Sequence, residues 1–227
     1  MLESTAPGAR RWTPAAALTR AREILRTEGP RSLLFRALAE TFYRRLLIFE
    51  LELRDSPAPA AFPGLSFAWL EEGRLAEYER LRPGHAGQAA SRLRAGDRCF
   101  GAWLDDELVA VRWIATRTAT IEYLDLPLQL ADGEVYHYDS FTSPSHRRRG
   151  LSVASQARLG EALRREGRRR IVRAVLPENR PAVRDAEKAG FQRAGRVGFV
   201  RLGPWRHEVR KRSSASASGT MRSGASV

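Results

Sequence analysis

The amino-acid sequence predicts an α/β fold of the α+β kind, in which helices flank a central sheet and a helical extension precedes it. Between residues 65 and 203, strand-like runs rich in β-branched and aromatic residues alternate with helix-favouring runs. The hydrophobic fraction of 43% is enough for a packed core in a chain of 227 residues. A proline-rich segment, residues 56–64, interrupts helix and central strand alike and therefore separates the extension from the domain.

Four parts follow from this division. Residues 1–55 form the helical amphipathic extension, residues 56–64 the linker and residues 65–210 the globular domain. Residues 211–227 form a tail dominated by Ser, Ala and Gly, which has little to bury, so we expect it to be disordered.

The extension is expected to contain two helices, residues 15–26 and 31–53, separated at Gly29-Pro30. Apolar residues recur at three- or four-residue spacing in the second helix, at Leu34, Leu38, Phe42, Leu46 and Phe49. One interpretation is that this stripe packs on the domain or on a second subunit, which would give a homodimer. The other is a peripheral membrane contact through residues 31–53, with Arg31, Arg44 and Arg45 beside anionic lipid.

The net charge of +13 predicts attraction to acidic partners, but its distribution weakens that inference. Lysine occurs only at Lys188 and Lys211, so the basic residues are almost all arginines, and they are spread along the whole chain. No zinc-finger spacing, basic zipper or RNA-binding aromatic signature accompanies them, so nucleic acid is not an expected partner. The single cysteine, Cys99, excludes an internal disulfide framework and a thiolate-rich metal site. We expect a cytoplasmic protein without a metal, with the inner face of the membrane as the alternative location.

The first half of the domain is expected to alternate between strands and helices. Strands are predicted at residues 65–70, 97–103, 108–116 and 120–128, and helices at residues 71–81 and 87–93. The acidic pair Asp105-Asp106 is typical of a turn between two strands.

The second half contains the more informative elements. A strand rich in aromatic residues ends at Thr142, a helix follows over residues 151–166, and a strand covers residues 170–176. A further helix begins after Asn179, which is suited to capping it, and a strand covers residues 191–202. Between the first strand and its helix lies the basic segment Ser143–Ser152. The first turn of a helix has backbone N–H groups without intrahelical partners, so an anion is stabilised there, and Gly150 lets the backbone approach it closely.

The spacing of Arg147, Gly150 and Ser152 resembles the acyl-coenzyme A pyrophosphate loop of the GNAT acetyltransferase superfamily. Ser152 stands where the family usually has Gly or Ala. A second family element follows in the right order: a strand ending in Leu176-Pro177-Glu178-Asn179, and a helix closing in Lys188-Ala189-Gly190-Phe191. The resemblance covers about residues 65–203 and implies a mixed, mostly antiparallel sheet.

The family resemblance implies transfer of an acyl group, usually acetyl, from coenzyme A to an amine within a ternary complex. It implies that acetyl-coenzyme A is the co-substrate and that the pantetheine arm lies along the end of the strand at Phe141 and Thr142. The residues implied around the pyrophosphate are Arg147, Arg148, Arg149, Gly150, Leu151, Ser152 and Asn179.

The reaction also needs a general base for the acceptor amine. Candidates are Glu134, His137 and Asp139 on the strand before the loop, and strand alternation places His137 and Asp139 on one face. The alternative is that these polar side chains are satisfied within the sheet.

Many family members carry a tyrosine as general acid in the last helix, and the matching residue here is Ala186. The thiolate could then leave unaided, or Tyr136, Tyr138 or water could protonate it. This difference keeps open a coenzyme-binding domain without turnover that has a regulatory role. A basic protein that binds membrane or nucleic acid is the remaining alternative. The acceptor amine itself is not identified by the sequence.

Overall fold

The computed structural model describes residues 43–58, 62–121, 123–202 and 205–212. The chain divides into two compact units, and the larger comprises residues 45–199 together with 208–227. Every cavity and ion pair described below belongs to described residues of this larger unit.

Ten strands and four α-helices are described. The strands are β1 (Tyr43–Glu52), β2 (Leu65–Trp69), β3 (Arg98–Leu104), β4 (Glu107–Ala115), β5 (Thr118–Ile121), β6 (Leu126–Gln129), β7 (Glu134–Thr142), β8 (Arg170–Val175), β9 (Gln192–Leu202) and β10 (Trp205–Arg212). The helices are α3 (Leu75–Leu81), α4 (Ala86–Arg94), α5 (Leu151–Arg165) and α6 (Arg180–Lys188). Short 3-10 turns occur at η1 (Leu53–Asp55), η2 (Glu72–Arg74) and η3 (Pro144–His146).

Eight of the strands form one mixed sheet in the order β10-β9-β1-β8-β7-β4-β3-β2. The pairs β1/β8, β2/β3, β3/β4 and β4/β7 are antiparallel, whereas β7 and β8 are parallel. Strands β5 and β6 form a separate hairpin. The expectation of a mixed, mostly antiparallel sheet flanked by helices is confirmed.

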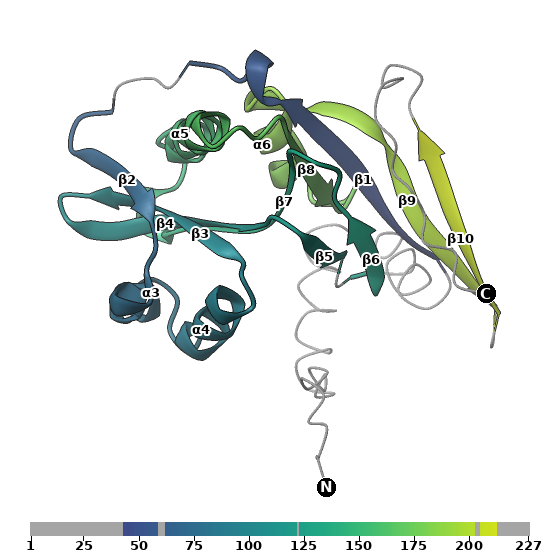
Figure 1. Ribbon diagram of the computed structural model, residues 1–227, viewed down its shortest axis with the longest axis horizontal. Helices are drawn as coiled ribbons and strands as arrows, with labels where there is room; N and C mark the ends of the chain where they lie inside the picture. The colour runs from purple at the N-terminus through teal and green to yellow at the C-terminus, as the bar shows by residue number, and fades with distance from the viewer. Residues whose placement is uncertain (1–42, 59–61, 122, 203–204, 213–227) are drawn as a thin grey trace, which may run out of the picture. The chain divides into compact units, whose positions relative to one another are not determined.

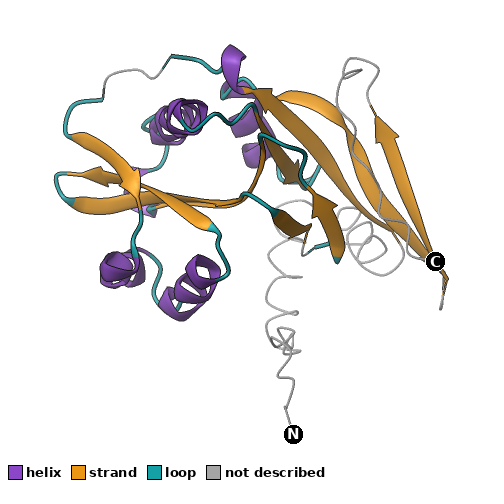
Figure 2. Ribbon diagram, in the orientation of Figure 1, coloured by secondary structure: helices purple, strands orange, loops and turns teal. Residues whose placement is uncertain are grey.

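Helices lie on both faces of the sheet (Figures 1 and 2). On one face, α5 and α6 bury Leu159, Leu163 and Val183 against apolar residues of β1, β7 and β8. On the other face, Tyr78 of α3 and Ala89 of α4 pack against β3 and β4, and a further cluster joins the β5/β6 hairpin to β1 and β9. Burial of these apolar side chains is the main source of stability for the layers.

Local sequence signals explain several boundaries. Asp105 and Asp106 both have positive φ angles, of 48° and 66°, and form the tight turn predicted between β3 and β4. Asn179 caps α6, because its side chain accepts a hydrogen bond from the Ala182 N–H at 3.2 Å.

The prediction of a helix over residues 31–53 is wrong for its second half. Residues 43–52 form β1, which lies between β9 and β8 in the main sheet, so the domain includes residues that precede the 56–64 segment. The reason is burial on both faces: Leu47 and Phe49 belong to the α5/α6 side, while Leu46 and Ile48 contact the hairpin cluster. A continuous apolar run contains helical spacings such as Leu46 to Phe49 without being a helix.

Two smaller corrections concern one predicted strand and the end of the domain. The strand expected over residues 120–128 is instead the β5/β6 hairpin, which turns near Asp125 at a positive φ of 47°. Strand β10 runs to Arg212, beyond the predicted end of the domain at residue 210. The helix predicted over residues 15–26, residues 31–42 of the second helix, and the tail from residue 213 lie outside the described residues. Within the described part of the chain, no helix is both long and apolar enough to span a membrane.

Candidate active site

The basic loop before α5 has the backbone geometry of an anion site. Gly150 precedes the helix with a φ of +80°, and Arg148 also has a positive φ, of 64°. The first hydrogen bond of α5 runs from the Ala154 N–H to the Gly150 carbonyl at 3.1 Å. The N–H groups of residues 151–153 therefore have no intrahelical acceptor and can donate hydrogen bonds to a ligand.

A cavity of about 300 Å³ lies between this loop and α6. Its lining includes Thr142, Arg147, Arg148, Gly150, Leu151 and Ser152 from the predicted coenzyme site. His146, Val153, Pro181, Arg184, Asp185 and Lys188 complete it. Four basic side chains against one acid make the cavity electropositive, which suits a polyanion such as a pyrophosphate.

Three residues predicted for the coenzyme site do not line this cavity. Phe141 lies beside it, with the Arg147 guanidinium 5.7 Å from its ring centre, while Arg147 Nε donates to the Thr142 carbonyl at 3.1 Å. Asn179 is used as the cap of α6, and Arg149 is also absent from the lining.

The end of β7 is separated from β8 in a way that exposes its backbone. Strand β7 pairs with β4 as far as Thr142, but its pairing with β8 stops at His137, opposite Arg173. Parallel partners that diverge leave one edge of β7 available for hydrogen bonds to an extended ligand, as an added strand would make them. This edge leads to the loop cavity at Thr142.

Arg112 anchors the first turn of α5 from inside the protein. Its side chain is 3% exposed and donates to Ser155 Oγ at 3.1 Å, to Gln156 Oε1 at 3.1 Å, and to both the carbonyl and the hydroxyl of Ser152 at 2.5 and 2.7 Å. Burial lowers the pKa of Arg112 to about 10, an effect that Asp185 opposes, so the guanidinium stays charged at neutral pH.

Ser152 connects this arginine to the cavity wall. Its hydroxyl hydrogen-bonds to Asp185, whose Oδ2 also accepts from Arg173 Nη1 at 3.2 Å. Burial alone would raise the pKa of Asp185, but the charge of Arg112 and the bonds from Ser152 and Arg173 hold it below its ordinary value. The serine at the family's small position is therefore explained by a buried ionic network that the sequence did not indicate.

The prediction that His137 and Asp139 share one face of β7 is wrong. Trp113 of β4 is opposite Asp139, and its neighbour Ile114 is opposite His137, so Tyr138 is an extra residue in the ladder. Such a β-bulge shifts the alternation by one residue. His137 therefore lies on the α5/α6 face with Ile114, and Asp139 lies on the α3/α4 face, paired with arginines from those helices.

His137 is enclosed and neutral. Its side chain is 1% exposed, and neither ring nitrogen has a hydrogen-bond partner within the described residues. Burial, together with the charges of Arg173 and Arg112, lowers its pKa well below 6.5. A histidine that is buried in this way does not fit the role of a general base that contacts the acceptor amine.

The buried His137 gives a testable dependence of stability on pH. Its pKa is lower in the folded chain than in the unfolded chain, so below about pH 6.5 the unfolded state binds the additional proton and is favoured. The stabilisation is complete above pH 6.5 and decreases by up to about 1.4 kcal/mol per pH unit below it. Between pH 7.5 and 5.5, the free energy of unfolding from urea titrations should fall more for the natural chain than for His137→Leu; equal slopes would contradict the assignment.

The other two base candidates are both held in ion pairs. Asp139 Oδ2 accepts from Arg82 and Arg92, each at 2.8 Å. Burial would raise its pKa, but the hydrogen bonds from these arginines keep the pKa below its ordinary value. Glu134 lies at the other end of β7, where it accepts from Arg170 at 3.1 Å and from the Ala131 N–H at 2.9 Å. The three candidates are thus separated, and none is an unpaired carboxylate or imidazole at the loop.

Two further positions are buried and chemically inactive. Ala186, at the position where many members of the family carry a tyrosine as general acid, is 0% exposed within the α5/α6 core. Cys99 is 1% exposed, and burial raises the pKa of its thiol, which keeps it protonated. No three His, Cys, Asp or Glu side chains in the described ranges are grouped to hold a metal ion.

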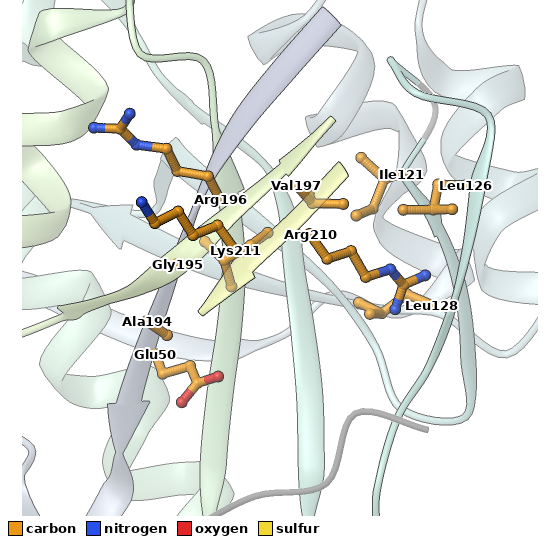
Figure 3. Close-up of a pocket in the computed structure, with 11 residues that line it drawn as sticks. Glu50, Ile121, Leu126, Leu128, Ala194, Gly195, Arg196, Val197, Arg210 and Lys211 are labelled. Carbon is orange, nitrogen blue, oxygen red and sulfur yellow. The ribbon is translucent and has the colours of Figure 1, made fainter. Parts of the chain in front are cut away.

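A larger cavity, of about 370 Å³, lies on another part of the fold (Figure 3). Its aliphatic wall contains Ile121, Leu126 and Leu128 from the hairpin and Ile48 and Val197 from β1 and β9, with Arg196, Arg210 and Lys211 also in its lining. It shares no residue with the loop cavity and contains no helix N-terminus, so it lacks the features that suit a pyrophosphate.

Comparison with known families agrees with the loop and the sheet. Residues 61–191, more than half of the chain, match the model of the acetyltransferase (GNAT) family. The chain belongs to this family. No protein with a curated description matches it.

Solved structures share the fold at low sequence identity. A GCN5-related N-acetyltransferase from Sphaerobacter thermophilus aligns with a TM-score of 0.52 and 16% identity, over 82% of this chain and 58% of that one. A tandem GNAT protein from the clavulanic acid biosynthesis pathway aligns with a TM-score of 0.51 and 17% identity, over 89% of this chain and 72% of that one. A GCN5-related glucosamine N-acetyltransferase region of a fungal multi-domain protein aligns with a TM-score of 0.52 and 14% identity, over 81% of this chain and 23% of that one. The chain thus spans little more than half the length of the first of these.

Proposed function

We propose that the chain is an N-acyltransferase that moves an acetyl group from acetyl-coenzyme A to an amine within a ternary complex. The observation that carries the proposal is the electropositive cavity at the N-terminus of α5, next to the free edge of β7. The coenzyme pyrophosphate would accept from the N–H groups of residues 151–153, with Arg147 and Arg148 adding charge. The pantetheine arm would run along the edge of β7 from Thr142 toward Tyr138.

The bulge at Tyr138 lies where β7 and β8 diverge, which supports acetyl transfer at this point. A bulged residue has backbone groups outside the regular hydrogen-bond ladder of the sheet. An N–H group there can donate a hydrogen bond to the thioester oxygen as it becomes an oxyanion. The neutral amine nitrogen forms a bond to the carbonyl carbon, the carbon–sulfur bond breaks, and the thiolate takes the electron pair. The proton lost by the amine nitrogen passes to water, since none of the three base candidates is free to accept it. Because Ala186 carries no acid, we propose that the thiolate leaves without a protein proton donor.

The enclosed Cys99 favours direct transfer over an acyl-enzyme route. We expect the initial-rate plots for acetyl-coenzyme A and amine to intersect, as in a ternary complex, and Cys99→Ala to retain turnover within about twofold. Thiol release should match the acetylated amine mole for mole, as measured by mass spectrometry. Parallel initial-rate lines, or loss of turnover in Cys99→Ala without loss of folding, would contradict direct transfer.

A second candidate is a domain that binds acyl-coenzyme A without turning it over. The buried Ala186 and the ion pairs that engage Asp139 and Glu134 favour this alternative. The same assay separates the two: binding with thiol release at background across a broad amine panel would support the second candidate.

A further inference from the structure

The face of the sheet opposite α5 carries a polar cavity of about 200 Å³ beside the β7 bulge. Its polar lining consists of Arg92, Asp97, Thr118, Thr120, Tyr136 and Tyr138. Tyr138 is the bulged residue itself, so the cavity adjoins the point at which the acetyl group would be transferred. An acceptor approaching from the α3/α4 side would occupy this cavity.

The negative side of the cavity is Asp97. One of its carboxylate oxygens, Oδ2, accepts from the Tyr138 hydroxyl at 2.7 Å. Burial, with this hydrogen bond, raises the pKa of Tyr138, so the tyrosine remains a donor that fixes the carboxylate in place. A fixed carboxylate is a partner for one ammonium group.

The positive side is Arg92. Its side chain is 14% exposed, donates to Asp139 Oδ2 at 2.8 Å, and lies 5.3 and 5.0 Å from the rings of Trp113 and Tyr138. Arg82 donates to the same Asp139 oxygen at 2.8 Å. Two guanidinium groups share one carboxylate, so this cluster has an excess of positive charge next to the cavity. A partly buried excess cation is stabilised by an anion from the ligand.

Arg92 and Asp97 do not neutralise each other. Both line the cavity, yet no ion pair within 4 Å joins these two described residues, and each is oriented by another partner. A cavity with separated, fixed charges of opposite sign is complementary to a molecule that carries both charges.

We propose that the acceptor is a small zwitterion, an amino acid, whose carboxylate binds Arg92 and whose amino group binds beside Asp97. This inference rests on the proposed acetyl transfer and specifies its acceptor. A polycationic amine fits poorly, because Asp97 is the one carboxylate among the described residues of the cavity lining and Asp139 behind it already accepts from two arginines. An uncharged apolar amine would leave the excess positive charge of the Arg82 and Arg92 pair uncompensated.

The test compares amino acids with matched amines in the full chain. The twenty amino acids, their amides, and the polyamine spermidine are offered with acetyl-coenzyme A, and thiol release is followed. At least one amino acid should be used with a kcat/KM tenfold or more above that of its amide, because the charge-assisted bond to Arg92 is lost in the amide. Arg92→Gln should raise KM tenfold or more for the amino acid and less than twofold for the amide, whereas Asp97→Asn should raise KM for both.

Arg94→Gln is the matched control. It removes the same charge from the same helix, at an exposed side chain that does not line the cavity, so both KM values should stay unchanged. Preference for spermidine, equal use of amino acid and amide, or an Arg92→Gln variant with unchanged KM would overturn the inference.

Two further measurements keep this inference separate from the proposed function. If acetyl-coenzyme A raises the melting temperature but no amino acid is acetylated, the zwitterion assignment fails and donor binding stands. If acetyl-coenzyme A has no effect, the proposed function fails, and calorimetric titration of the chain with the amino acids decides the assignment: binding that Arg92→Gln weakens tenfold supports it, and no binding refutes it.

Discussion

Gly150→Glu should abolish binding of acetyl-coenzyme A while the chain stays folded. A Cβ built at Gly150 meets no atom within 4 Å, so the side chain fits, and the cost to folding is the left-handed φ of +80°, about 1–2 kcal/mol. The carboxylate, however, would stand where the pyrophosphate is expected, at the amides before the α5 ladder. We expect affinity to fall about 100-fold or more, equivalent to about 2.7 kcal/mol.

Melting curves measure this effect directly. For the natural chain, acetyl-coenzyme A at about 100 times its Kd should add about 2.7 kcal/mol and raise Tm by roughly 5–10 °C. At the same ligand concentration, a 100-fold weaker Gly150→Glu should retain only about 0.4 kcal/mol, a shift of no more than about 2 °C. Gly167→Glu is the control at the opposite end of α5, because Gly167 has a φ of +78° and is equally free of neighbours. A control variant that loses the shift, or a Gly150→Glu chain that keeps it, would contradict the assignment of the loop.

Arg112→Met should destabilise the fold more than any other single change discussed above. The substitution removes four hydrogen bonds from a 3% exposed residue, together with one of the two arginine charges that lower the pKa of Asp185; Arg173 remains paired with Asp185. A buried hydrogen bond from a charged donor contributes roughly 1.5–3 kcal/mol, and the partners left behind lose it without gaining water, so we expect a total loss of about 3–5 kcal/mol. The first turn of α5 would also lose its anchor at Ser152, so coenzyme binding should weaken in whatever fraction remains folded.

Urea unfolding of Arg112→Met and of Arg98→Met provides the comparison. Arg98 is an arginine on the neighbouring strand β3, but its ion pair with Glu166 is one-third exposed, so its loss should cost no more than about 1 kcal/mol. Adding Asp185→Asn to Arg112→Met should recover part of the loss, because Asp185, left with Arg173 as its compensating arginine, then no longer carries a charge. Equal free energies of unfolding for the two single variants would show that the Arg112 network contributes no more than a surface pair.

The elements that the sequence predicted well are those whose signals are local. The loop before α5 is marked by its glycine, its basic residues and the helix after it, and the Asp105-Asp106 turn and the Asn179 cap are likewise coded by adjacent residues. Strand β1 was mispredicted because its burial on both faces comes from β8, β9 and the hairpin, which are distant in sequence.

The site residues that were missed depend on pairing and burial. The bulge at Tyr138 arises from the register between β7 and β4, which composition does not record, and it reverses the face on which Asp139 lies. The structural role of Arg112 was missed for a different reason. The basic residues of the chain are nearly all arginines, so the sequence does not distinguish a buried arginine from those at the surface. The continuous apolar run on both sides of Arg112 in β4 was the available signal, since a charged residue within a strand buried on both faces needs internal partners.

A crystal structure of the full chain with coenzyme A tests the central claim most directly. The pyrophosphate should lie against the N–H groups of residues 151–153, between Arg147 and the α6 side chains, with the pantetheine arm along β7 toward Tyr138. Coenzyme density elsewhere, such as in the aliphatic cavity beside Ile48 and Val197, or no density at saturating ligand, would contradict the claim.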